Sequence, residues 1–120
     1  DLSTFVGRIF EDCCREWVGR YSSLGDGALE IGSWWSRQSD VEVDIVTLTK
    51  KGYGLLGSCK WSTRQVGENV LDDLYVVRGI LGRPAATARL VLFSRSSFTR
   101  AVRARAADEN VTLVDVADLF

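Results

Sequence analysis

Val41–Val46 (VEVDIV) and Leu55–Trp61 (LLGSCKW) are the two segments that decide the fold of this chain. Their alternating apolar and polar residues predict two neighbouring β-strands. The alternation places Glu42 beside Asp44 on one face of the first strand, and it puts Lys60 near the end of the second. A carboxylate and an ammonium group among apolar strands cost desolvation free energy. The pair therefore indicates either an ion pair or a functional site.

The segments around these strands predict a single α/β domain over residues 1–120. The first two helices have apolar residues at helical spacing, and the strand near residue 90 is the continuous apolar run ARLVLF, which is typical of a strand covered on both faces. We expect the order α-β-β-β-α-β-α-β around a central mixed sheet with flanking helices. The expected elements are helices over residues 3–20, 66–81 and 96–107 and strands over 28–35, 41–48, 53–61, 88–93 and 111–114.

The helix ends and the buried helix faces are also predicted. Ser3 is the expected N-cap of the first helix, and Ser96 or Ser97 that of the last. In the first helix, Glu11 lies at the border between the apolar and polar faces, so its carboxylate could point inward or into solvent. The apolar stripe expected to enter the core consists of Leu2, Phe5, Ile9, Cys13 and Trp17.

Composition restricts the chemistry and the location of the protein. The chain has no His, which excludes His-based acid–base catalysis, Ser-His-Asp triads and the commonest zinc sites. It has three Cys without CxxC spacing, so we expect reduced thiols and a cytoplasmic protein. No apolar run approaches the roughly 20 residues of a membrane span, so no membrane partner is expected. The chain begins at Asp1 and contains no Met, which suggests a piece of a longer protein.

Four motifs in order carry a family resemblance. They are Val6–Cys14 (VGRIFEDCC), Ile31–Trp35 (IGSWW), Glu42–Val46 (EVDIV) and Gly57–Trp61 (GSCKW), within about the first 75 residues. With them the chain resembles the domain of unknown function at the C-terminus of many archaeal and bacterial ATPases, within the restriction-endonuclease-like PD-(D/E)xK superfamily. The resemblance implies a nuclease fold, DNA as a partner, and an ATPase domain in the same chain.

The same resemblance implies roles for particular residues. Asp44 would be the principal ligand of Mg²⁺ or Mn²⁺, Glu11 an assisting acid from the helix, and Lys60 the cation that neutralises the phosphate or orients the attacking water. Ser58 stands where the superfamily has Asp or Glu, two residues before the Lys. A hydroxyl is a weak ligand for a hard dication, and Glu42 is the candidate to compensate.

Three further residues are candidates for contacts to the nucleic-acid backbone. Arg64 follows the third strand at the start of a helix, where backbone amides can also bind phosphate. Arg100 and Arg103 share one face of the last helix. Arg100 and Arg103 have a plainer interpretation as residues of a solvated helix face, so Arg64 is the first candidate for such a contact.

Three functional interpretations stay open on this basis. The first is a metal-dependent DNA or RNA phosphodiesterase. The second is a catalytically inactive nuclease-like module that binds DNA or a protein partner for an attached ATPase. The third is a structural domain with a buried Asp44–Lys60 ion pair. A homo-oligomer is compatible with each of them.

Overall fold

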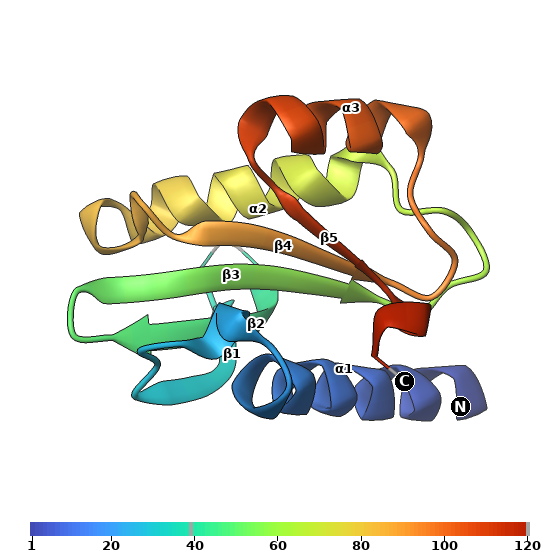
Figure 1. The fold of residues 1–120 in the computed structure, drawn as a ribbon, viewed down its shortest axis with the longest axis horizontal. Coiled ribbons are helices and arrows are strands. Elements are labelled where there is room, and N and C mark those ends of the chain that lie inside the picture. The colour runs from blue at the N-terminus through green and yellow to red at the C-terminus, as the bar shows by residue number, and fades with distance from the viewer. Residues whose placement is uncertain (39, 120) are drawn as a thin grey trace.

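The chain folds as a five-stranded mixed sheet between two layers of helices (Figure 1). The computed structural model describes residues 1–38 and 40–119 of the 120. The order of elements is as the sequence predicts. The helices and strands are α1 (Leu2–Arg20), β1 (Glu30–Ser36), β2 (Val41–Thr49), β3 (Gly52–Lys60), α2 (Glu68–Leu81), β4 (Arg89–Ser94), α3 (Arg100–Glu109) and β5 (Thr112–Asp115).

The strands lie in the sheet in their sequence order, β1 to β5. The first three form an antiparallel meander, and β3–β4 and β4–β5 pair in parallel across the helices α2 and α3. Figure 1 shows α2 and α3 on one face of the sheet and α1 on the other. This arrangement confirms the predicted mixed sheet and its two helical crossovers.

Separate apolar clusters fill the two sides of the sheet. On the side of α2 and α3, Leu56 of β3 packs with Leu71 and other residues of that cluster. On the side of α1, the neighbouring Leu55 packs with Phe10 and Phe93. Because successive strand residues point to opposite faces, β3 contributes one fully buried leucine to each cluster. The central strands are covered on both faces, as the apolar run in β4 predicts.

The helix α1 buries a different face from the predicted one. Phe10, Cys14 and Val18 are buried, whereas Leu2, Phe5 and Ile9 are exposed, so the expected stripe is wrong at these three positions. Figure 1 shows the first turns of α1 extending past the ends of the strands. In the described part of the chain, no strand lies beneath these turns to cover their apolar residues.

The predicted N-caps are also wrong. Asp1 caps α1 through its side chain, which accepts a hydrogen bond from the amide of the third following residue at 2.9 Å. Thr99 caps α3 in the same way, at 3.2 Å. Ser97 instead has a positive φ of 76° and its carbonyl accepts a hydrogen bond from the Ser94 hydroxyl, so it belongs to the turn before the helix.

None of the described helices combines the length and the apolar character that crossing a membrane requires.

Candidate functional site

Asp44 lies at an irregularity of β2. The pairing of β1 with β2 shifts register between Gly32 and Trp34. Val43 packs in the cluster on the α2 side while Ile45 packs on the α1 side, although strict alternation would put both on one face. Asp44 lies between them. Bulges of this kind redirect single side chains, so strand alternation alone does not set the direction of Asp44.

The Asp44 carboxylate extends the hydrogen bonding between β2 and β3. Toward Asp44, the last residue pair of these two strands is Ile45 with Gly57. Beyond that pair, the Asp44 Oδ2 atom accepts a hydrogen bond from the Cys59 amide at 2.7 Å. The Ser58 hydroxyl donates to the same oxygen at a long 3.5 Å. The side chain thus takes the place of a backbone acceptor where the strands separate, which fixes one carboxylate oxygen.

Arg15 of α1 holds the backbone of Asp44. Its Nη1 atom donates to the carbonyl oxygen of Asp44 at 2.6 Å, and its Nη2 atom donates to the Asp12 carboxylate at 2.6 Å. The guanidinium therefore connects the helix to the irregular part of β2. Its position keeps one cation close to the Asp44 side chain as well.

Three carboxylates that the sequence singles out line one cavity of about 280 Å³. Glu11 reaches it from α1, while Glu42 and Asp44 reach it from β2. We call it the acidic cavity after these three residues. Arg8 also lines it, together with residues of the Ser33–Trp35 segment of β1. The structure thus brings the predicted metal-ligand candidates together, and it resolves the ambiguity of Glu11 in favour of a site-facing position.

The electrostatics of the acidic cavity oppose full ionisation. Burial raises the pKa of Glu11, and the negative charges of Asp44 and Glu42 raise it further, against the effect of Arg15. Burial also raises the pKa of Asp44, whereas the Cys59 amide and the Lys60 ammonium group lower it. Close carboxylates that repel one another are stabilised by any cation that enters between them.

Lys60 does not pair directly with Asp44. Lys60 is exposed at the end of β3, and no ion pair joins it to Asp44 among the described residues. Its charge still acts on Asp44, whose pKa it lowers. The interpretation as a buried structural ion pair is therefore wrong.

A second cavity, of about 470 Å³, begins at Lys60. Arg64 lines it from the loop after β3, together with polar residues before and at the start of α2, including Gln65 and Asn69. We call it the cationic cavity after Lys60 and Arg64. Neither Arg100 nor Arg103 is among the described residues that line it. Arg103 lies over the Phe98 ring at 5.7 Å and donates a hydrogen bond to the Ser97 hydroxyl.

The acidic cavity offers the donor type that Mg²⁺ and Mn²⁺ prefer, which is carboxylate oxygen. Across the described residues, however, no group of three or more His, Cys, Asp or Glu side chains is assembled closely enough to hold a metal ion. One Asp44 oxygen is already bound by the Cys59 amide. The described residues therefore form a cavity with carboxylate oxygens of the right type but without an assembled set of metal ligands.

Fold and cavities together define an α/β domain with an acidic cavity beside a strand irregularity and a cationic cavity at the adjacent strand end. Residues 1–70 match DUF234, a family described as archaeal and bacterial proteins of unknown function. Because this match spans more than half of the 120 residues, the chain belongs to that family. No match was found among curated proteins, and none among solved structures.

Sequence reasoning missed the role of Arg15. Its partner is a backbone carbonyl at the irregular part of β2, and no spacing of residue types reveals such a partner. The only available signal was that Arg15 lies one helical turn after Glu11, which places both on the same side of α1.

Proposed function

We propose that the chain is a nuclease-fold domain of the restriction-endonuclease-like type, which binds Mg²⁺ or Mn²⁺ in the acidic cavity and the phosphate backbone of DNA at the cationic cavity. Its activity would be hydrolysis of a phosphodiester bond between the two. The observation that carries the proposal is the convergence of Glu11, Glu42 and Asp44 on one cavity. The family match supports no activity by itself.

The neighbourhood of Ser58 supports this assignment of the site. Ser58 directs its hydroxyl toward the Asp44 carboxylate. A glutamate at position 58 would bring a second acid to that place, which is what the resemblance requires there. Lys60 is the next but one residue on the same strand, and its charge acts on Asp44.

Each group has a defined task in the proposed reaction. A divalent cation would supply Lewis-acid stabilisation of the phosphate and a bound water of lowered pKa. Asp44 and the glutamates would hold that cation. Lys60 would neutralise charge on the phosphate, and Arg64 would position the nucleic-acid backbone.

A catalytically inactive nuclease-like module is the second candidate. Two observations favour it. The described residues contain no preassembled group of three metal-ligating side chains, and Ser58 replaces an acid. In this case the cationic cavity would bind DNA without a metal, or the domain would bind a protein partner, in the service of an ATPase domain in the same chain.

Calorimetric titration with Mn²⁺ distinguishes the two candidates. The variants are Asp44→Asn, which keeps an acceptor for the Cys59 amide, and Ser58→Glu, which restores the missing acid. Glu16→Gln is the matched control, because Glu16 is an exposed acid of α1 outside the acidic cavity. Thermal unfolding of every variant shows whether the fold is retained.

Wild-type binding that is lost in Asp44→Asn and kept in Glu16→Gln would support the metal site, and cleavage of DNA should then require Mn²⁺ and Lys60. Absent wild-type binding that Ser58→Glu restores would support the inactive module. Absence of binding in all four proteins would overturn the metal site altogether.

DNA binding is tested separately by fluorescence anisotropy in the presence of a chelator. Replacing Lys60 and Arg64 by Gln should weaken DNA binding and reduce its dependence on salt. The variant would neutralise fewer phosphates, so fewer counterions would be released from the DNA on binding. Unchanged affinity in this double variant would show that the cationic cavity is not the DNA-binding surface.

A further inference from the structure

A third cavity, lined mainly by polar residues, lies at the other end of the sheet from Asp44. It has a volume of about 380 Å³ and lies where β3 and β4 begin. Arg78 of α2 and Arg89 of β4 line it, together with Thr87, Glu109 and Asn110. It shares no lining residue with the acidic or the cationic cavity.

Among the described residues, the two arginines of this cavity donate hydrogen bonds to neutral acceptors. The Arg78 Nη1 atom donates to the Ala88 carbonyl at 3.3 Å, and the guanidinium lies over the Tyr75 ring at 5.0 Å. The Arg89 Nη1 atom donates to the Thr112 hydroxyl at 3.4 Å. In the part of the chain that the structure describes, neither arginine forms an ion pair. Among the described residues, no carboxylate oxygen therefore lies within ion-pair distance of either guanidinium group.

Glu109 lines the same cavity, but its carboxylate is occupied from another side. Arg105 donates to both of its oxygens, at 2.8 and 3.3 Å. The Tyr75 hydroxyl donates to one of them at 2.5 Å. These hydrogen bonds lower the pKa of Glu109. Both oxygens of Glu109 thus have donors other than the two cavity arginines, and the ion pair with Arg105 offsets its negative charge.

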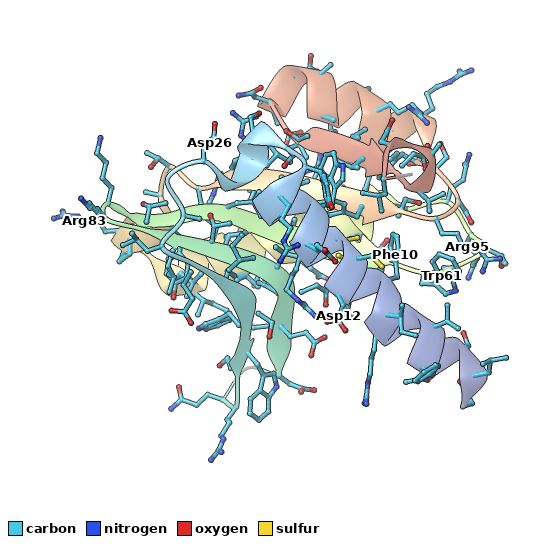
Figure 2. The ribbon with its side chains drawn as sticks, turned by 60° about the horizontal axis from the view of Figure 1, so that its bottom comes forward. Phe10, Asp12, Asp26, Trp61, Arg83 and Arg95 are labelled. Atoms are coloured by element: carbon cyan, nitrogen blue, oxygen red, sulfur yellow. The ribbon has the colours of Figure 1, made fainter. Side chains whose placement is uncertain are left out.

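Further cations surround this end of the molecule. Lys50 and Lys51 lie in the turn between β2 and β3, and Arg83 follows α2. The turn is packed against the Arg83 segment, because Gly52 approaches the carbonyl of Pro84 too closely for a Cβ atom to fit. Within the described residues these three cations also lack ion pairs. Figure 2 shows Arg83 at the opposite end of the molecule from Trp61 and Arg95.

We propose that Arg78 and Arg89 form a binding site for a phosphate group, at a distance from the acidic cavity and independent of any metal. Planar guanidinium groups match the oxygens of a phosphate and can donate two hydrogen bonds each. Lys50, Lys51 and Arg83 raise the local concentration of polyanions through longer-range attraction. The phosphate belongs either to a small phosphorylated molecule or to the backbone of a nucleic acid.

The test measures binding of pyrophosphate and of a short DNA duplex in separate titrations of the whole chain, both with a chelator present. The variants are Arg78→Gln, Arg89→Gln and the double variant. Arg20→Gln is the control, because Arg20 is an exposed arginine of α1 outside all three cavities. Arg89→Gln removes no contact to the backbone, so it tests the site even if Arg78→Gln unfolds the chain.

We expect each single variant to weaken binding about tenfold, since a charge-assisted hydrogen bond contributes on that scale. Saturable pyrophosphate binding would identify a small phosphorylated ligand. Duplex binding that has a steep salt dependence and is weakened in Arg89→Gln, without pyrophosphate binding, would identify a nucleic-acid backbone. Absence of both, or affinities equal in wild type and Arg89→Gln, would overturn the proposal. Because no metal is present and Lys60 is unchanged, a failure here leaves the proposed nuclease site untouched.

Discussion

At the scale of single residues, Asp44 shows how a backbone irregularity creates a site. The register shift in β2 separates Val43 from Ile45 onto opposite sides of the sheet. The carboxylate between them replaces a backbone acceptor for the Cys59 amide, while the Arg15 guanidinium holds the Asp44 carbonyl. An apolar side chain at this position could not accept the hydrogen bond from the Cys59 amide, and this buried polar group would then lack a partner. The local backbone is therefore arranged around the carboxylate.

Replacing Arg15 by Met should lower the free energy of unfolding by about 1–3 kcal/mol, because the Asp44 carbonyl loses its partly buried donor. Chemical denaturation measures this effect. Arg20→Met is the control: Arg20 pairs with Glu16 at 3.7 Å on the exposed side of the same helix, where a change within about 0.5 kcal/mol is expected. Equal losses in both variants would contradict the role of Arg15.

At the scale of elements, one arginine joins α2 to α3. Arg105 of α3 donates to Glu109 within its own helix and to Asp72 and Glu68 of α2, at 2.7 and 3.5 Å respectively. The Tyr75 hydroxyl adds a donor to Glu109 from α2. The helices α2 and α3 are thus connected at the surface by charged and polar groups, in addition to their apolar contacts in the core.

This network makes a prediction about acid stability. Hydrogen bonds from Arg105 and Tyr75 lower the pKa of Glu109 in the folded chain. The carboxylate therefore contributes stability above its unfolded pKa, and that contribution is lost as the pH falls through the lower, folded pKa. The free energy of unfolding should accordingly decrease less steeply with falling pH in Glu109→Gln than in the wild type.

Asp118→Asn is the comparison for this experiment. Its carboxylate accepts the Asp115 amide at 2.9 Å and has no ion pair among the described residues. An acid dependence of Glu109→Gln as steep as the wild type's would show that Glu109 is not coupled to folding.

At the scale of the whole molecule, a single sheet separates two apolar clusters. Leu55 and Leu56 are both fully buried, and they face opposite clusters. Both clusters depend on the same central strand, so neither can lose its packing alone. We expect the chain to unfold in one cooperative transition.

Replacing Leu55 or Leu56 by Ala should each lower the free energy of unfolding by about 2–5 kcal/mol, through lost burial and a residual cavity. Leu29→Ala should change it little, because the Leu29 side chain is 69% exposed. Calorimetry and circular dichroism should report the same single midpoint for each variant. Two separate transitions in either leucine variant would show that the two sides of the sheet fold independently.

The sequence alone predicts the order of elements, the mixed sheet and its buried central strands. Hydrophobic periodicity carries this information, because it depends only on residues near one another in the chain. The resemblance to known motifs adds Glu11 and Asp44 as candidate metal ligands, and strand alternation adds Glu42 as a candidate that could compensate for Ser58. All three residues line the acidic cavity, and their role as metal ligands stays a prediction.

Other features were decided only by the tertiary structure. The buried face of α1 depends on where the strands end, so Phe10 enters the core while Phe5 stays exposed. The register shift at Asp44 and the Arg15 contact depend on how β1 and α1 pack on β2. The cavity between Arg78 and Arg89 forms where distant segments meet. The local pattern of apolar and polar residues determines which helices and strands form. Which polar groups meet is determined by packing between segments that are distant in the sequence, because local periodicity carries no information about those contacts.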